Sequence, residues 1–195
     1  MTEQDTPRVY LAKPDLTTEA ELCELARASE DLHRPWAFPG KDHHEYDEFL
    51  RRIEIGRTVP FLIRHVASNR ICGVVNLNEP VMGLFRSAYL GFYAAQEFAG
   101  QGFMSEGLCL VLDCAFSELG FHRLEANIQP GNQPSRALVK RLGFRLEGYS
   151  PRYLLIDGDW RDHERWAILS ESWPAARLHF FATQRNDKRQ SQHGR

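Results

Sequence analysis

The stretch QEFAGQGFMSEGL, residues 96–108, points most directly to a fold. It places Gly100 and Gly102 immediately before a strongly amphipathic run that keeps one face apolar as far as Leu119. Two glycines around a single residue, at the start of a helix, are typical of a loop whose backbone comes close to a ligand. The alternative is a tight turn between a strand and a helix, with no ligand at all.

Two common phosphate-binding loops do not match these glycines. A P-loop requires a lysine after its last glycine, and the sequence has Phe103 there. A dinucleotide fingerprint requires a third glycine at the position of Ser105. What remains is a pyrophosphate held by main-chain amides alone, assisted by the dipole of the helix that begins near Phe103. Lysine is dispensable there if the phosphates are bound but never cleaved.

The segment PGNQPSRALVKRLGFRLEG, residues 130–148, supplies a second motif. Asn132 and Ser135 stand at the start of a short amphipathic helix, which Gly143 ends. By themselves these residues predict only an N-cap and a C-cap. Each motif alone is unspecific, but the glycine loop and this second motif together form a specific pattern.

Hydrophobic periodicity outside these motifs predicts alternating helices and strands. Two early helices have capping-box patterns, Thr18 with Glu21 and Asp42 with Glu45. Asp157-Gly158 predicts a hairpin turn. The predicted strands are 9–11, 59–66, 70–77, 87–94, 122–129, 144–156 and 160–169, and the later helices are 103–119 and 135–142. This order predicts a single-domain α/β (α+β) fold, with a mixed central sheet of about six to seven strands flanked by helices.

Composition limits the possible functions. The chain has 195 residues, 43% of them hydrophobic, and a net charge of −2, which predicts one globular domain that binds neither DNA nor a membrane. No apolar signal core begins the chain, and the four cysteines lack metal-binding spacing, so we expect a cytoplasmic protein with reduced thiols and no metal. Residues 184–195 hold four Lys or Arg against one Asp, four minus one, or +3. This tail is either solvated or in weak contact with ribosomal RNA.

With both motifs in view, the sequence resembles the GCN5-related N-acetyltransferase (GNAT) superfamily. Within it, the sequence is most similar to the branch that acetylates the N-termini of ribosomal proteins, the ribosomal-protein-alanine N-acetyltransferases. Residues 89–108, 121–149 and 153–169 carry the resemblance. It implies an acetyltransferase domain over 8–172, after a flexible N-terminus, 1–7. A C-terminal extension with a partly disordered basic tail would follow over 173–195.

The resemblance implies acetyl-CoA as the cofactor. The pantetheine arm would lie like an extra strand beside Phe92 and Tyr93, and Asn132 would form a hydrogen bond with it. The strands at 87–94 and 122–128 would separate near Asn127 and leave a slot for the thioester. The pyrophosphate would lie on six consecutive residues, Phe98, Ala99, Gly100, Gln101, Gly102 and Phe103.

The resemblance places Ser135 near the CoA sulfur, and its hydroxyl is the predicted proton donor to the departing thiolate. The base is less defined. Tyr153, His163 and Glu164 are candidates, directly or through water, and Tyr153 is counted with Ser135 among the predicted catalytic residues. Leu154 occupies the position at which some relatives have a glutamate base.

Trp36 and Phe38, in the loop after the first helix, would join Tyr153 in lining a groove for the acceptor; the alternative for Trp36 is simple packing. The predicted function is transfer of acetyl from acetyl-CoA to a primary amine in a ternary complex. The preferred acceptor is the N-terminal α-amine of a ribosomal protein that begins with Ala or Ser, and the enzyme would be a monomer or homodimer. A polyamine or aminoglycoside acetyltransferase and a non-catalytic acyl-CoA-binding module remain alternatives.

Overall fold

The computed structural model describes residues 7–193, with the backbone alone for 185–193. Within this range, seven strands form one sheet in the order β1-β2-β3-β4-β5-β7-β6. All neighbours are antiparallel except β4 and β5, which run parallel. The strands are β1 Val9–Ala12, β2 Thr58–His65, β3 Ile71–Val81, β4 Ser87–Ala94, β5 Arg123–Ile128, β6 Arg145–Ile156 and β7 Asp159–Leu169. The predicted mixed sheet is confirmed.

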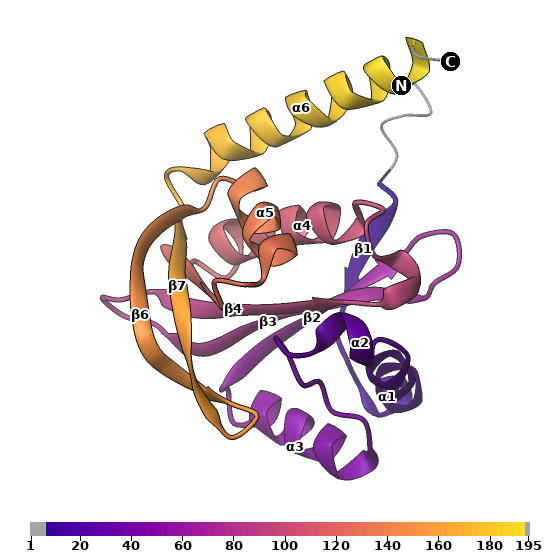
Figure 1. The fold of residues 1–195 in the computed structure, drawn as a ribbon, viewed down its shortest axis with the longest axis vertical. Helices are drawn as coiled ribbons and strands as arrows, with labels where there is room; N and C mark the ends of the chain where they lie inside the picture. Colours follow the sequence, from indigo (N-terminus) through magenta and orange to yellow (C-terminus); the bar gives the residue numbers. More distant parts are fainter. Residues whose placement is uncertain (1–6, 194–195) are drawn as a thin grey trace.

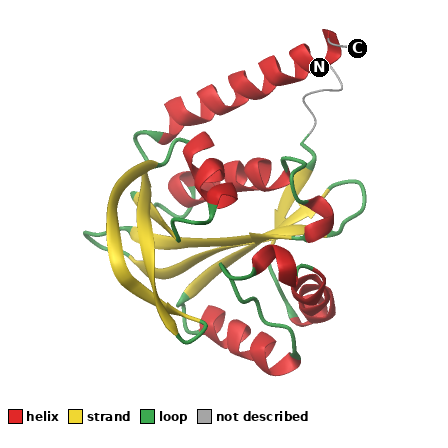
Figure 2. Cartoon of the chain, viewed as in Figure 1, coloured by secondary structure: helices red, strands yellow, loops and turns green. Residues whose placement is uncertain are grey.

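Helices cover both faces of this sheet (Figures 1 and 2). The main core lies between the sheet and α4, α5 and α6, and a smaller core lies beneath α1 and α3 on the other face. The α-helices are α1 Glu19–Ala28, α2 Glu30–His33, α3 His43–Glu54, α4 Phe103–Ser117, α5 Gln133–Arg141 and α6 Trp173–His193. Two 3-10 turns, η2 Leu16–Thr18 and η3 Gln96–Phe98, precede α1 and α4.

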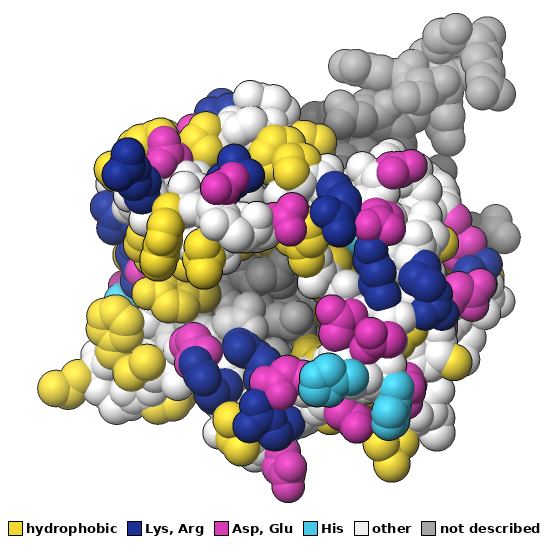
Figure 3. Space-filling model, turned by 60° about the horizontal axis from the view of Figure 1, so that its bottom comes forward, with side chains coloured by type: hydrophobic (Ala, Val, Ile, Leu, Met, Phe, Trp, Pro, Cys, Tyr) yellow, Lys and Arg dark blue, Asp and Glu magenta, His cyan; other side chains and the backbone are white. Residues whose placement is uncertain are grey.

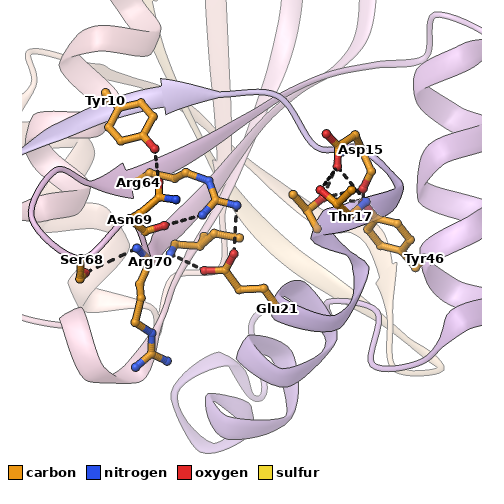
Figure 4. Close-up of polar contacts among 11 residues, drawn as sticks. Tyr10, Asp15, Thr17, Glu21, Tyr46, Arg64, Ser68, Asn69 and Arg70 are labelled. Atoms are coloured by element: carbon orange, nitrogen blue, oxygen red, sulfur yellow. Dashed lines mark hydrogen bonds and ion pairs between the residues drawn. The ribbon is translucent and has the colours of Figure 1, made fainter.

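The start of α1 corrects one prediction. Thr18 and Glu21 do not form a capping box; instead, Asp15 caps η2, and the Thr18 hydroxyl accepts a hydrogen bond from the Asp15 amide. The Glu21 carboxylate is used elsewhere, because it accepts hydrogen bonds from Arg64 on β2 (2.9 Å) and from the Ile71 amide on β3 (2.8 Å). Figure 4 shows Glu21 turned toward Arg64. Glu21 therefore fastens α1 to the sheet.

Other local predictions are confirmed. Asp42 accepts a hydrogen bond from the Glu45 amide at 2.9 Å and so caps α3. Asp157 and Gly158 both have positive φ, +51° and +80°, as expected of the two central residues of a tight hairpin turn between β6 and β7.

The segment after the predicted domain continues as α6. Its Trp173 and Phe180 are buried in the main core, and the Trp173 indole donates to Asp113 of α4 at 2.8 Å. Residues 1–6 of the predicted flexible N-terminus lie outside the described residues, as do the side chains of the basic tail beyond 184. The proposed limits, 8–172, stay a prediction. Over the described part of the chain, none of the helices has both the length and the apolar character needed to cross a membrane.

Candidate active site

The glycine loop presents a row of free amides at the N-terminus of α4. Gly100 and Gly102 have φ of +73° and +85°, left-handed values that favour glycine. Among the described residues, no acceptor is bonded to the N–H groups of 100–105. A Cβ added to Gly100 would meet nothing within 4 Å, so this part of the loop faces open space. Six unpaired donors in succession, at the positive end of a helix dipole, are an arrangement suited to an anion.

This row is displaced from the predicted one. The amides of Phe98 and Ala99 are already bonded to the carbonyls of Ala95 and Gln96, at 3.0 and 3.2 Å, because residues 96–98 form η3. These two amides are therefore not available to a phosphate. The free amides begin at Gly100 and continue two residues past Phe103. Among the predicted phosphate-binding residues, Gly100, Gln101, Gly102 and Phe103 have free amides, and their binding of a phosphate stays a prediction.

Arg8 holds the loop from outside. Its guanidinium donates to Glu106 in the first turn of α4 (Nε to Oε1, 2.9 Å) and to the carbonyl of Gln101 (3.1 Å). The same group lies 4.4 Å from the centroid of the Phe103 ring. Sequence analysis missed Arg8, since 98 residues separate it from Glu106 and no local pattern marks the contact.

The parallel strands β4 and β5 separate beside this loop. Their pairing ends at Tyr89 with Glu125, and beyond it β5 pairs only with β7. The edge of β4 that holds Phe92 and Tyr93 is therefore open toward β5, as the predicted slot requires. Asn127 lies on β5 just past the separation, and its Oδ1 is buried without a partner. A buried acceptor with no donor suggests that a ligand supplies the hydrogen bond.

The predicted residues of α5 keep free polar groups. Asn132 caps the helix, because its Oδ1 accepts a hydrogen bond from the Ser135 amide at 3.2 Å. The Asn132 side-chain nitrogen and the Ser135 hydroxyl make no hydrogen bond within the described residues. Both remain available to a ligand.

The side of the opening that lies opposite α5 has a phenol, that of Tyr153. A β-bulge between Ser150 and Leu154 interrupts the β6–β7 register and places Tyr153 6.0 Å from His163, ring centroid to ring centroid. Burial and the neighbouring hydroxyl of Tyr89 raise the pKa of Tyr153 above its usual range. Its phenol therefore stays protonated near neutral pH and suits proton donation better than the predicted role of base.

The other two candidate bases have structural partners. The Glu164 carboxylate pairs with Arg136 of α5 at 2.8 Å and accepts a hydrogen bond from the Trp166 indole at 2.9 Å. His163 is buried, its Nδ1 lies 2.9 Å from the carbonyl of Arg161, and burial lowers its pKa.

Glu125 is a further carboxylate beside the opening, and it was not among the predicted site residues. It lies at the last paired position of β4 and β5, opposite Tyr89, with 15% of its side chain exposed and Arg123 at 2.6 Å. Leu124 and Ala126 are buried in the main core, so strand alternation directs Glu125 to the other face. The signal in the sequence is this alternation in RLEANI.

The loop that follows α2 lies near the acceptor side of the opening. A Cβ on Gly131 would lie 2.8 Å from the Trp36 ring, so this ring packs against the β5–α5 connection. The Arg34 guanidinium lies 4.7 Å from the Phe38 ring and 3.6 Å from a carboxylate oxygen of Asp157 in the β6–β7 turn. Figure 3 views the molecule from the side of α3 and this turn, and the surface is hollowed at its centre. Trp36 thus makes a packing contact, Phe38 is 40% exposed, and the lining of an acceptor groove by these two residues stays a prediction.

The chain also matches a known protein family. Residues 8–145 match the Acetyltransferase (GNAT) domain. The chain belongs to the GNAT acetyltransferase family. The predicted family and fold are confirmed.

Relatives of this GNAT differ in how much of the chain they match. The "[Ribosomal protein uS5]-alanine N-acetyltransferase" of Escherichia coli is 41% identical over 107 residues, 55% of each chain, so the match spans about half the length of that enzyme. The "Probable N-acetyltransferase YjcK" of Bacillus subtilis is 34% identical over 170 residues, 83% of this chain and 94% of the relative.

Solved structures show the same fold. "Mycobacterium smegmatis RimJ in complex with CoA-disulfide" has a TM-score of 0.80 and 29% identity, over 91% of this chain and 90% of that one. The spermidine N-acetyltransferase from Vibrio cholerae in complex with CoA and spermine has a TM-score of 0.74 at 22% identity, over 86% and 99%. The second likeness concerns the fold alone.

Acetyl-CoA is the cofactor of this family, and the residues present fit it. The free amides of 100–105 match a diphosphate, and the open edge of β4 matches an extended arm with amide groups. The unpaired Oδ1 of Asn127 lies where that arm would end.

No cysteine of this GNAT is suited to nucleophilic catalysis. Burial raises the pKa of the Cys72 thiol to about 11 and that of Cys109 to about 12, and it also raises those of Cys23 and Cys114. The thiols therefore stay protonated near neutral pH, which favours direct transfer over an acyl-cysteine. In the described part of the chain, no group of three or more His, Cys, Asp or Glu side chains is arranged to hold a metal.

Proposed function

We propose that this GNAT acetylates the N-terminal α-amine of a protein, with a ribosomal protein that begins with Ala or Ser as the preferred acceptor. The observation that carries the proposal is the charge of the acceptor face. Two carboxylates beside the separation of β4 and β5, those of Glu125 and Glu147, both bond to Arg123, at 2.6 Å and 3.2 Å. A polyamine or an aminoglycoside carries several positive charges and needs unpaired carboxylates, whereas an α-amine has one charge at most.

The similarity to the uS5-alanine enzyme of Escherichia coli supports the same acceptor class. The likeness to spermidine acetyltransferases does not favour a polyamine, because it lies at 22% identity. We propose a cytoplasmic enzyme, a monomer or homodimer, that binds neither DNA nor a membrane.

The acceptor amine must lose its proton before it attacks. An N-terminal amine has a pKa of about 7.7–8.0, against about 10.4 for lysine, so a weak base suffices. We propose that Glu125 accepts this proton, directly or through one water, because its carboxylate lies where the strands separate. Glu125 and Glu164 both pair with an arginine, but Glu164 is directed to α5 on the other face of the sheet. Acetyl-CoA, when bound, supplies the acetyl group as a thioester with a good leaving group.

Two hydroxyls are available on the donor side. The Tyr153 phenol stays protonated and can donate a hydrogen bond toward the reacting atoms. The Ser135 hydroxyl, at the N-terminus of α5, can donate to the departing sulfur. The loop residues orient the cofactor and need not transfer protons.

Turnover with defined acceptors tests the function. The protein is incubated with acetyl-CoA and, separately, Ala-start peptides, Ser-start peptides, spermidine and an aminoglycoside, while free thiol is followed. We expect the peptides to give the highest kcat/KM. Turnover of spermidine or the aminoglycoside alone contradicts the proposal, and tight acetyl-CoA binding without any turnover favours a binding module.

Ser135→Ala should lower kcat about tenfold or more while the KM for the peptide changes little, because the hydroxyl would act after the acceptor is bound. The N-cap should survive, since the Asn132 side chain bonds to the Ser135 amide rather than to its hydroxyl. Steady-state kinetics checks the effect, and thermal unfolding checks the cap. A wild-type kcat would leave Ser135 as a cap residue only.

A further inference from the structure

Arg165, in the middle of β7, is a cation without a partner on the acceptor face. Within the described residues, its guanidinium makes no ion pair and no hydrogen bond, and its Nε is buried without an acceptor. Buried charges are normally paired, and a buried donor without an acceptor costs free energy. A ligand oxygen would remove this cost.

The sheet directs Arg165 to the face on which the acceptor would lie. Its neighbours Glu164 and Trp166 bond to each other, and Glu164 also pairs with α5, so strand alternation places Arg165 on the opposite face. Across the sheet, Arg165 is the register partner of Asn127, the residue just past the separation of β4 and β5. An amine that approaches this opening therefore passes close to Arg165.

The Arg165 guanidinium lies against Gly148 of β6. Gly148 faces Arg165 in the β6–β7 register, and a Cβ there would lie 2.5 Å from the Arg165 Nη2, so a larger residue would displace the guanidinium from this position. The Glu147 carboxylate accepts hydrogen bonds from Arg123 and, within the described residues, makes no ion pair with Arg165. The charge is thus both positioned and left unpaired.

We propose that Arg165 binds the oxygen next to the acceptor amine, which in a peptide is the carbonyl of its first residue. Arg165 would then be a specificity-determining residue that selects amines with a neighbouring carbonyl or carboxylate over simple amines and polyamines. A guanidinium suits this role because its N–H groups form strong hydrogen bonds to carbonyl and carboxylate oxygens. The proposal rests on the proposed function, since it names the group by which the same acceptor is recognised.

Kinetics of Arg165→Gln with three acceptors tests the proposal. These are an Ala-start tripeptide, free L-alanine as a source of a carboxylate, and isopropylamine, which lacks the oxygen. For the tripeptide, we expect KM to rise about tenfold to a hundredfold, the range for a lost hydrogen bond to a charged group. The KM for acetyl-CoA and the kinetics with isopropylamine should stay within about twofold. Each comparison uses one amine with two enzymes, so differences in amine basicity cancel.

Two further variants separate recognition from damage to the fold. Arg165→Lys keeps the charge and should recover part of the lost affinity. Arg51→Gln removes an exposed arginine of α3 that pairs with Glu48, and it should leave every constant unchanged. Equal losses with tripeptide and isopropylamine, a parallel rise in the KM for acetyl-CoA, or an unchanged KM for the tripeptide would overturn the proposal. A wild-type enzyme that turns over only polyamines would instead refute the proposed function.

Discussion

Replacing Gly102 with valine is expected to lower the affinity for acetyl-CoA about a hundredfold or more. Gly102 has φ of +85° and is the N-cap of α4, a conformation that a β-branched side chain strongly disfavours. The backbone must move to relieve the strain, and the free amides on both sides then lose their common direction. The loss of two hydrogen bonds to phosphate, at about 1.5–3 kcal/mol each, is enough for this effect. Equilibrium titration with acetyl-CoA measures it.

Gly56→Val is the matched control. Gly56 also has a left-handed φ, +74°, and a Cβ there would meet nothing within 4 Å, but it lies between α3 and β2, away from the loop. Both variants should lose a similar part of the free energy of unfolding, and only Gly102→Val should lose acetyl-CoA binding. If Gly102→Val kept its affinity for acetyl-CoA, or if both variants lost that affinity equally, then the phosphates must bind at another site.

Interactions within a few residues made most of this fold predictable. The strand predicted at 87–94 is β4, Ser87–Ala94, because alternation and flanking turns act locally. The caps at Asp42 and Asn132 are found for the same reason. The glycine loop was recognisable because phosphate binding by backbone needs glycine at positions with left-handed φ.

Contacts between distant residues were not predictable in this way. Glu21 has the spacing of a capping box, but Arg64, 43 residues away, competes for its carboxylate. The position at which β4 and β5 separate decides which face of β5 is directed toward an acceptor. Glu125 could therefore not be identified from its charge alone. Arg165 was overlooked for the same reason, because only the folded sheet shows that it lacks a partner.

Replacing Glu125 with glutamine is expected to lower kcat for an Ala-start peptide about 10²- to 10⁴-fold at neutral pH, the usual contribution of a general base. The amide has nearly the same shape but cannot accept the proton of the acceptor ammonium. Raising the pH above the pKa of the peptide amine, about 8, should recover much of the rate, since the acceptor is then already neutral. A pH profile of kcat for both enzymes measures the loss and the recovery.

Glu164→Gln provides the comparison, because Glu164 is also a carboxylate paired with an arginine but bonds to α5 and to Trp166. It should lower the free energy of unfolding, by about 1–3 kcal/mol for a weakened buried charge pair, and leave the pH profile of kcat unchanged. The two variants thus distinguish two roles. The Glu125 carboxylate accepts a proton, whereas the Glu164 carboxylate attaches α5 to the sheet. If Glu125→Gln keeps the wild-type profile, or if a high pH recovers none of its rate, then Glu125 serves only to pair with Arg123 and the amine loses its proton to water.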